Sequence, residues 1–348
     1  MKLSEKEWQE FDFNALKLEV INSKAYHLAN VEDDDTGVAY LTRTKYNNSF
    51  NMCVKNNALK INPANTISFG AESAHFFYQP FRYITGNKMY YIKNGKINKF
   101  IGLFLQCSLQ SSVESCFSFG NGMIPERVKK KKIVLPVDAN GDPDWNFMEK
   151  YITGIEKQKE KDALIFIKTQ LNTISYADLI KLDEKEWKPF PINKIFKVLS
   201  GKRLESYNMV AGERPFIGAT DSGNGITNYI SNENDSLDKN VLGVNYNGNG
   251  MAISFYHPYE CIFSDDVKRF HLKEYPDNKY VLLFFKAIIL QQKPKYNYGY
   301  KFNGTRMKRQ IIMLPVNDAG NPDYEYMEQY IKNLMIKKYK AYLEYAEK

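Results

Sequence analysis

The side chains that most often carry catalytic or metal chemistry are few in this chain and lie far apart in its sequence. They are the four cysteines and four histidines Cys53, Cys107, Cys116, Cys261, His27, His75, His257 and His271. No two cysteines form a Cys-x-x-Cys pair, which argues against a zinc site or a disulfide framework and favours reduced thiols. The dispersed histidines also give no Ser/His/Asp or Cys/His signature of nucleophilic catalysis. We therefore expect no metal site and no catalytic residues.

Two proline-containing tetrapeptides could belong to an enzyme. Asn321-Pro322-Asp323-Tyr324 differs at one position from the Asn/Asp-Pro-Pro-Tyr tetrapeptide of amino-methyltransferases, and Asp142-Pro143-Asp144-Trp145 is its counterpart. A methyltransferase also needs a glycine-rich turn that opens a helix, whereas the best glycine cluster, 243–250, precedes a predicted strand. Proline near the first helical position and acids in the first turn are typical of helix starts. Helix capping is therefore the preferred interpretation of both tetrapeptides.

Each Pro-Asp pair could also begin the Pro-Asp…Glu-x-Lys metal site of a nuclease. The one plausible Glu-x-Lys after the first pair is Glu186-Trp187-Lys188, which lies far downstream in a segment expected to be a linker. The second pair has none. Metal-dependent cleavage by this chain is therefore disfavoured.

Cations, amides and hydroxyls gather in the loops between predicted strands. Arg and Lys can read guanine edges, Asn and Gln can read adenine edges, and small polar residues can hold phosphates. The basic runs Arg127–Lys132 and Arg306–Arg309 follow aromatic-glycine turns and are predicted to clamp phosphates, with a solvated basic face as the alternative. The candidate DNA-binding residues are Arg43, Lys45, Asn47, Asn48, Arg127, Lys129, Lys130, Thr220, Asp221, Ser222, Asn224, Asn245, Tyr246, Asn247, Asn249, Tyr296, Tyr298, Lys301, Arg306, Lys308 and Arg309.

These features occur twice because the chain is an internal duplication. LSEKEW at 3–8 recurs as LDEKEW at 182–187, and LPVDANGDPDWNFMEKYI at 135–152 recurs as LPVNDAGNPDYEYMEQYI at 314–331. Both repeats, and the two basic runs, share one offset of 179 residues. Two units of this size are too few and too large for a solenoid, so two globular domains in tandem are expected.

Each half combines short β-rich segments with helices, which predicts an α+β fold. A helix at 99–110 or 279–292 precedes a strand, and a long helix closes each half, near 144–170 and from 323 onward. The expected divisions are a first globular domain at 1–143, a central spacer helix and linker at 144–179, a second globular domain at 180–322 and a C-terminal spacer helix at 323–348.

The two closing helices carry apolar stripes that suit helix packing. The stripe residues are Met148, Ile152, Ile155, Met327, Ile331, Leu334, Ala341 and Tyr345. Core packing within each domain is the alternative, but the order domain, helix, domain, helix favours an antiparallel pair that acts as a spacer. Some 25 residues give a spacer of about 38 Å, close to the roughly 34–36 Å between DNA half-sites one helical turn apart.

The charge and the apolar content of the chain indicate which classes of partner to expect. The chain has 348 residues, with 48 Lys and Arg against 40 Asp and Glu, for a formal net charge of +8. A moderate basic excess favours an anionic partner, although a solvated surface could carry the same charge. The N-terminal segment lacks the apolar stretch of a signal peptide, and the longest apolar runs are too short to span a bilayer. We expect a cytoplasmic protein with no membrane partner.

Each half resembles a target-recognition domain of the restriction–modification DNA specificity subunits, the type I S subunit superfamily, and is most similar to its BcgI-like type. The resemblance covers nearly the whole chain, and the second half matches better. In the first half, 39–48 lacks the Gly-Ala-Thr-Asp run, and Ile67–Gly70 replaces an Asn-Tyr-Asn-Gly loop. The segments that carry the resemblance are Phe216–Ile226, Val244–Gly248, Tyr296–Gly299, Met307–Val316 and Asp318–Glu328.

The resemblance implies a non-catalytic subunit that reads a bipartite double-stranded DNA site, with one half-site for each domain. The helices would set the separation and dock methyltransferase subunits or fused methyltransferase–endonuclease subunits. No cofactor is expected on this chain; S-adenosylmethionine and Mg²⁺ would belong to the partners.

Two other hypotheses stay open. The chain could be a self-contained DNA methyltransferase or nuclease, which would have to bind a cofactor itself. It could also be an orphan scaffold or inhibitor that docks on a modification enzyme without reading DNA. In the scaffold case, replacing Arg306, Lys308 and Arg309 by Ala would leave DNA affinity unchanged.

Overall fold

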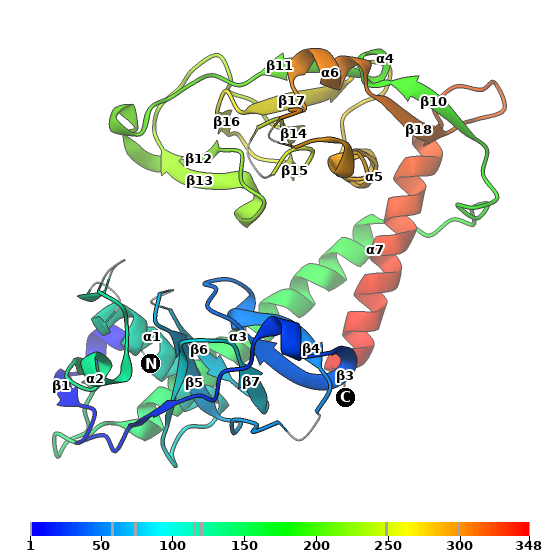
Figure 1. Cartoon of the computed structure of the whole chain (residues 1–348). Helices are drawn as coiled ribbons and strands as arrows, with labels where there is room; N and C mark the ends of the chain where they lie inside the picture. The colour runs from blue at the N-terminus through cyan, green and yellow to red at the C-terminus, as the bar shows by residue number, and fades with distance from the viewer. Residues whose placement is uncertain are drawn as a thin grey trace. The chain divides into compact units, whose positions relative to one another are not determined.

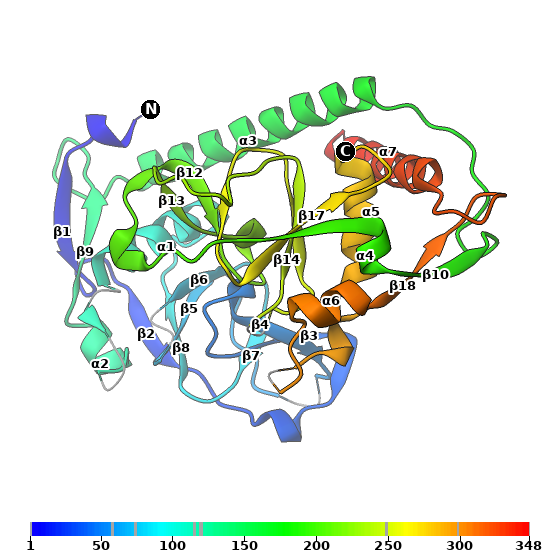
Figure 2. The same cartoon turned by 90° about the horizontal axis from the view of Figure 1, so that it is seen from above.

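A computed structural model describes residues 2–56, 59–72, 75–113, 116–117, 121–247, 250–297 and 299–347 (Figure 1). The chain divides into two compact units, Met1–Ala163 and Leu164–Lys348. Helix α3, Trp145–Thr173, is one continuous helix that crosses this division (Figure 2). No helix within the described residues is long and apolar enough to cross a membrane.

Unit 1 contains three small sheets. The strands of the four-stranded sheet are all antiparallel, whereas β3 and β7 of the three-stranded sheet run parallel. In spatial order, the sheets are β2 (Glu19–Asn22), β8 (Met89–Lys93), β5 (Thr66–Gly70) and β6 (Phe76–Gln79); β4 (Phe50–Val54), β3 (Asp33–Leu41) and β7 (Tyr83–Thr85); and β1 (Trp8–Asp12) with β9 (Lys132–Pro136).

Unit 2 repeats this topology strand for strand, including the parallel pair. Its sheets are β11 (Phe196–Ser200), β17 (Val267–Leu272), β14 (Val241–Asn245) and β15 (Ser254–His257); β13 (Ile226–Ile230), β12 (Ala211–Ile217) and β16 (Ile262–Phe263); and β10 (Trp187–Pro191) with β18 (Ile311–Pro315). The duplication predicted from sequence is therefore also a duplication of fold, and its mixture of helices with mainly antiparallel strands agrees with the α+β prediction.

Strand register relates the two units residue by residue. Ile67 lies opposite Ile92 in unit 1, and Leu242 lies opposite Phe270 in unit 2. A bridge between Asn62 and Tyr83 likewise has its counterpart between Asp238 and Cys261. The register matches Asn62, Ile67, Gln79, Tyr90 and Tyr91 of unit 1 with Asp238, Leu242, His257, Lys268 and Arg269 of unit 2.

Each unit has its own main core, in which a helix packs on the four-stranded sheet. In unit 1, α1 (Lys99–Val113) contributes Phe104 and Leu105 to a core with Phe69 of β5. In unit 2, α5 (Lys279–Leu290) contributes Phe285 beside Phe270 of β17. Because each core is separate, each unit can hold its own loops in place.

A set of contacts ties the start of each unit to its last helix; we call it the closing module. The Lys6 ammonium lies 2.7 Å from the Asp144 carboxylate, and that of Lys185 lies 2.8 Å from Asp323. The same aspartates accept the third backbone N–H of α3 and of α7 (Tyr324–Ala346), at 2.9 and 3.0 Å. The indole of Trp8 donates to a backbone carbonyl at 3.2 Å, and that of Trp187 does so at 3.1 Å. Both tetrapeptides are therefore helix caps.

Several sequence expectations need correction. Glu186-Trp187-Lys188 is not in a linker, because Trp187 begins β10, which pairs with β18. Prolines at 189 and 191 obscured this strand; they are tolerated because β10 has β18 as its single partner. Strands β1, β2, β4, β7, β11 and β13 were also missed.

The apolar stripe divides between core and surface. Met148, Met327 and Ile331 are buried in the main cores of their own units, and Ile152 packs against the core of unit 1. For these four, the contacts are the within-domain alternative. The exposed members of the stripe are Ile155, Leu334, Ala341 and Tyr345.

Candidate nucleic-acid interface

Two loops at equivalent places have the same backbone hydrogen bonds; we call residues 42–49 and 218–225 the first and second tip loops. The amide of Thr42 donates to Ser49 at 2.9 Å, and that of Gly218 donates to Gly225 at 2.9 Å. The next shared bond, from Thr44 to Thr42 and from Thr220 to Gly218, measures 2.8 and 2.9 Å. Each loop follows the central strand of its three-stranded sheet, so the two units present the same backbone with different side chains.

Both tip loops are anchored by an asparagine with left-handed backbone geometry. Asn48 has φ 51° and Asn224 has φ 54°, a region that Asn tolerates better than most residues. The Asn48 amide donates to the Tyr78 carbonyl at 3.1 Å, and the Asn224 amide donates to the Tyr259 hydroxyl at 2.8 Å. These two predicted DNA contacts thus fasten the loops to strand ends.

Other side chains of the tip loops are exposed before these asparagines. They include Lys45, Tyr46 and Asn47 in the first loop and Asp221 and Ser222 in the second. The Lys45 ammonium lies 5.4 Å from the Tyr46 ring centroid. Arg43 is ion-paired with Glu72, which also accepts from Lys88 at 3.0 Å, so the Arg43 charge is already compensated.

Unit 2 has a cationic cleft of about 740 Å³ between β11, β17 and α6 (Gly304–Arg309). The Lys268 ammonium lies 4.5 Å from the Tyr246 ring centroid and 3.1 Å from the Ser200 hydroxyl. Partial burial lowers the pKa of Lys268, and the nearby Asp265 and Asp266 carboxylates oppose that effect. The cleft is lined by Asn193, Val198, Ser200, Tyr246, Lys268, Asn303, Gly304, Thr305, Lys308 and Arg309.

The cleft and the second tip loop meet at the end of β14. Asn245, whose side chain is buried, donates to the Thr220 carbonyl at 2.7 Å and so carries the loop. The next residue, Tyr246, lines the cleft. Asn247 donates to Asp266 at 2.9 Å. The side-chain amides of Asn245 and Asn247 therefore already donate hydrogen bonds within unit 2. Predicted Asn249 lies outside the described residues.

The first arginine of each basic run holds its own loop. Arg306 donates to the Lys301 carbonyl at 3.0 Å, and Arg127 donates to the Gly122 carbonyl at 3.2 Å, five residues upstream in both cases. The Arg306 guanidinium also lies 3.8 Å from the Tyr300 ring centroid. The cations of the two runs that are exposed include Lys129, Lys130, Lys308 and Arg309.

An aromatic cluster supports the basic run of unit 2. Tyr296 stacks on Tyr300 with centroids 5.8 Å apart, and its hydroxyl donates to Gln310 at 2.6 Å. Predicted Tyr298 lies outside the described residues, as do Phe119 and Gly120 of the matching turn in unit 1. Tyr296 is therefore fixed between α6 (Gly304–Arg309) and the loop before it.

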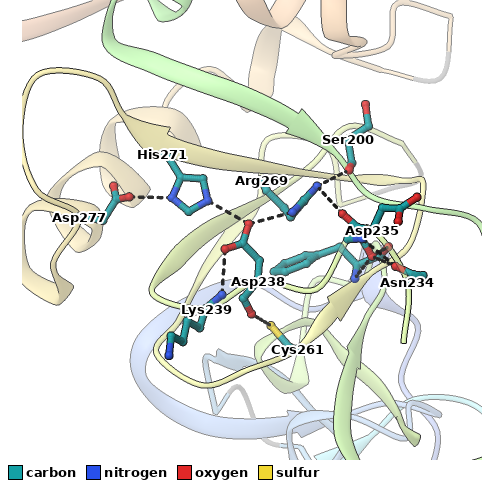
Figure 3. Close-up of polar contacts among 11 residues, drawn as sticks. Ser200, Asn234, Asp235, Asp238, Lys239, Cys261, Arg269, His271 and Asp277 are labelled. Atoms are coloured by element: carbon teal, nitrogen blue, oxygen red, sulfur yellow. Dashed lines mark hydrogen bonds and ion pairs between the residues drawn. The ribbon is translucent and has the colours of Figure 1, made fainter. Parts of the chain in front are cut away.

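A partly buried polar network in unit 2 centres on Asp238, Arg269 and His271 (Figure 3). Asp238 accepts from Arg269 at 2.9 Å and contacts His271 at 2.9 Å, and the other ring nitrogen of His271 lies 2.7 Å from Asp277. The two aspartates raise the pKa of His271 to about 9. Burial alone would raise the pKa of Asp238, but the bonds from His271 and Arg269 keep it below its usual range. The network is therefore a set of opposite charges fixed in place.

The same network contains a cysteine, a histidine and an aspartate, yet it has the wrong protonation for catalysis. Cys261 is fully buried, and burial raises the pKa of its thiol to about 12. His271 is an imidazolium held by two carboxylates, so it has no free nitrogen to act as a base. Within the part of the chain that the structure describes, no group of three or more His, Cys, Asp or Glu could hold a metal ion. The arrangement ties β17 to the end of β11 and to the loop before β14.

Sequence reasoning missed Lys268 and Arg269. The first lines the cleft and the second carries the network, and both lie on β17. Their signal in the sequence was a pair of cations inside a segment of strand character, Val267–Leu272. A buried strand seldom carries charge without a partner or a ligand, so this pattern could have marked the edge.

Comparison with known proteins identifies a family for both halves of the chain. A family model described as Type I restriction modification DNA specificity domain matches residues 5–164 and 184–344. The Type II restriction enzyme BgcI specificity subunit S.BcgI of Heyndrickxia coagulans is 42% identical over 319 residues, which is 91% of this chain and 91% of that protein. The S subunit of the Type-I restriction-modification system from M. genitalium aligns with 100% of this chain and 94% of its own length, with TM-score 0.50 and 13% identity. That structure shows a likeness of fold alone.

Proposed function

The chain belongs to the family of type I restriction–modification DNA specificity domains and is a specificity subunit; from this premise we propose that it reads a bipartite double-stranded DNA site. Each unit reads one half-site through its tip loop and the surface beside it. The bases between the half-sites are spanned without being read. The chemistry of methylation and of any cleavage belongs to partner subunits, which bind S-adenosylmethionine and Mg²⁺ in the cytoplasm.

One observation carries this proposal: a cationic cleft and a tip loop of fixed backbone are both held at the end of β14. Lys268, Lys308 and Arg309 line the cleft together with Tyr246, and the preceding residue, Asn245, holds the Thr220 carbonyl of the loop. Cations that contact phosphates position a protein on DNA, whereas polar side chains on a fixed loop can read base edges. Unit 2 therefore offers both kinds of contact, phosphate-binding cations and a fixed polar loop, around the end of β14.

The contacts of the central helix support a spacer role. The last turns of α3 and the linker after it lie along α7 within unit 2. Phe166 packs edge-on against Tyr339, with ring centroids 6.5 Å apart, and Gln329 donates to the Ser175 carbonyl at 2.8 Å. The Tyr326 hydroxyl donates to Ile180 at 2.9 Å. As the residue number rises on the α3 side it falls on the α7 side, which is the order expected of an antiparallel pair.

The decisive test is long-read methylation mapping of the native host with and without this gene. We expect one bipartite N6-methyladenine motif to disappear on deletion. An unchanged pattern, combined with absence of DNA binding by the purified complex, would contradict the proposal. Tight S-adenosylmethionine binding by this chain alone in calorimetry would instead favour a self-contained methyltransferase.

The phosphate role of the cleft can be tested with a charge-matched pair of variants. Lys308→Ala/Arg309→Ala removes two exposed cleft cations, whereas Lys338→Ala/Lys340→Ala removes two exposed cations from α7. Arg306 is left intact because it holds its own loop. We expect the cleft variant to lower the slope of log K against log salt by about 0.9 for each phosphate that it no longer binds. Equal slopes for both variants would contradict the assignment, and a scaffold that does not read DNA would show no change in slope.

The spacer role has its own test. Insertion of four residues after Lys159 adds about one helical turn, roughly 6 Å, to α3. We expect the number of unread bases to change while both half-site sequences stay the same. A change in either half-site sequence would contradict the two-reader arrangement.

A further inference from the structure

We propose that Lys45 and Asp221 are specificity-determining residues at one matched position of the two half-sites, where Lys45 selects guanine and Asp221 selects cytosine. This inference rests on the proposed function. It goes further by assigning base identities to two residues that the structure places at the same point of the two tip loops.

The two positions are equivalent by hydrogen bonding. Thr44 and Thr220 make the same backbone bond at the start of each loop. Their hydroxyls each accept from the amide two residues later, at 3.2 Å from Tyr46 and 3.4 Å from Ser222. Lys45 and Asp221 therefore sit inside the same small turn, one residue after the threonine. The Cα atoms of Lys45 and Asp221 therefore occupy the same position in the backbone of their loops.

The loop backbone is held firmly on the far side as well. The left-handed asparagine after the turn is fixed by hydrogen bonds to Tyr78 and Gln79 of β6 in unit 1 and to Tyr259, two residues after β15, in unit 2. A base-reading group needs such support, because a side chain on a mobile loop loses binding energy to ordering. The anchors supply position, and the residue between them supplies the choice of base.

The side chains at this position are exposed and have opposite charge. Lys45 and Asp221 are both exposed. Among the described residues, no carboxylate pairs with Lys45 and no cation pairs with Asp221, so both groups are available. A lysine can donate to O6 and N7 of guanine, whereas a carboxylate can accept from the N4 amino group of cytosine.

Asp221 gives the stronger argument for base reading. A carboxylate beside DNA is repelled by the phosphates, so it needs a hydrogen bond from a base to offset that repulsion. Asp221 follows Thr220, whose carbonyl Asn245 holds, in a loop with a fixed backbone. An exposed acid at this place in a DNA-reading loop fits a cytosine reader, because the N4 amino group of cytosine supplies the hydrogen bond that offsets the repulsion.

The test uses the full chain with its catalytic partners in a host that lacks the system, read by methylome sequencing and by binding to a set of duplexes. Asp221→Asn keeps the size of the side chain but offers the amide that suits adenine. We expect one base of one half-site to change from cytosine to adenine and the other half-site to stay unchanged. Lys45→Ala should lower discrimination for guanine at one base of the opposite half-site by about 5- to 100-fold. Glu213→Gln is the matched control, since Glu213 is an exposed acid of β12 in the same unit.

Each outcome decides something. A wild-type complex that yields no motif removes the proposed function itself. A normal wild-type motif with an unchanged motif for Asp221→Asn overturns the inference and leaves the proposed function intact. If Asp221→Asn merely tightens binding to every duplex, or Lys45→Ala weakens all duplexes equally and lowers the salt slope, the residues act on phosphates and the inference is also overturned.

Discussion

The closing module has the same contacts in both units, whereas the four-stranded sheets of the two units differ in charge. Lys6 and Asp144 repeat as Lys185 and Asp323, with the same cap and nearly the same distances. At the matched strand positions, however, Tyr91 of unit 1 is replaced by Arg269 of unit 2. The contrast separates what the fold requires from what each unit is free to vary.

The buried polar groups show the difference most clearly. Asn62 donates to Ser23 at 2.6 Å in unit 1, so this position belongs to a neutral network. Its counterpart Asp238 pairs with Arg269 and His271, so the same position in unit 2 is charged. Neutral hydrogen bonds satisfy a buried position at any ordinary pH, but a charged network is balanced only while every member keeps its charge. The stability of unit 2 should therefore depend more strongly on pH and on the loss of a single charged side chain than the stability of unit 1.

The largest expected effect follows from removing the buried guanidinium of that network. Arg269→Met leaves Asp238 with His271 as its remaining charged partner and takes the donor from the Ser200 and Asp235 carbonyls, and we expect unit 2 to lose ~3 kcal/mol of stability. Peptide-resolved hydrogen exchange can report β14 and β17 separately from β5 and β8. Tyr91→Phe at the matched position is the control and should change the stability of unit 1 by less than ~1 kcal/mol. Equal losses in the two units would break the comparison.

The second prediction concerns alkaline pH. The folded pKa of His271 is raised to about 9 from its ordinary value of 6.5, so its stabilisation is complete below pH 6.5 and disappears as the pH rises through 9. The full shift would be worth about 3 kcal/mol; screening at its 22% exposed side chain reduces our expectation to ~2 kcal/mol. Chemical unfolding at pH 6 and at pH 9.5 measures it. His271→Gln should abolish this slope, and a slope that persists in the variant would have another origin.

Acid should weaken unit 2 through a different histidine. His257 is fully buried, and burial lowers its pKa to about 4. Its contribution is therefore present above pH 6.5 and disappears as the pH falls through 4. Its counterpart Gln79 does not titrate; it donates to Ser68 at 2.9 Å and to Asn48 at 3.1 Å. Unfolding measured between pH 7 and pH 4 should show this acid-side loss in unit 2 and not in unit 1, which again distinguishes the two units.

The fourth prediction tests the similarity and not the difference. Asp144→Ala and Asp323→Ala each remove a helix cap and a partly buried ion pair, so each should cost ~2 kcal/mol, and by nearly the same amount. Asp→Asn at either position keeps the cap and should cost about half as much. Unequal losses in the two units, measured by hydrogen exchange at the first turns of α3 and α7, would show that the closing modules are alike in geometry only.

Sequence is a good guide wherever the controlling interactions are local. The starts of α3 and α7 are predictable because Pro143, Asp144 and their counterparts act within one turn. The anchoring bonds of Asn48, Asn224 and Asn245 are not, because their partners come from segments distant in sequence. That these three residues contact DNA stays a prediction. An asparagine that anchors a loop and one that does not look the same in a sequence.

The smallest effect is expected at the tip loop of unit 1. Glu72 is shared by Arg43 and Lys88 on the surface, so Glu72→Gln should leave the unfolding midpoint nearly unchanged. It should nevertheless free Arg43 to contact a phosphate and raise the salt slope of DNA binding by up to about 0.9. Glu32→Gln, which frees Lys55 on the same unit, is the matched control. If only Glu72→Gln steepens the slope, the weaker electrostatics of unit 1 are set by one carboxylate; if neither does, the difference between the units lies in the cleft of unit 2 alone.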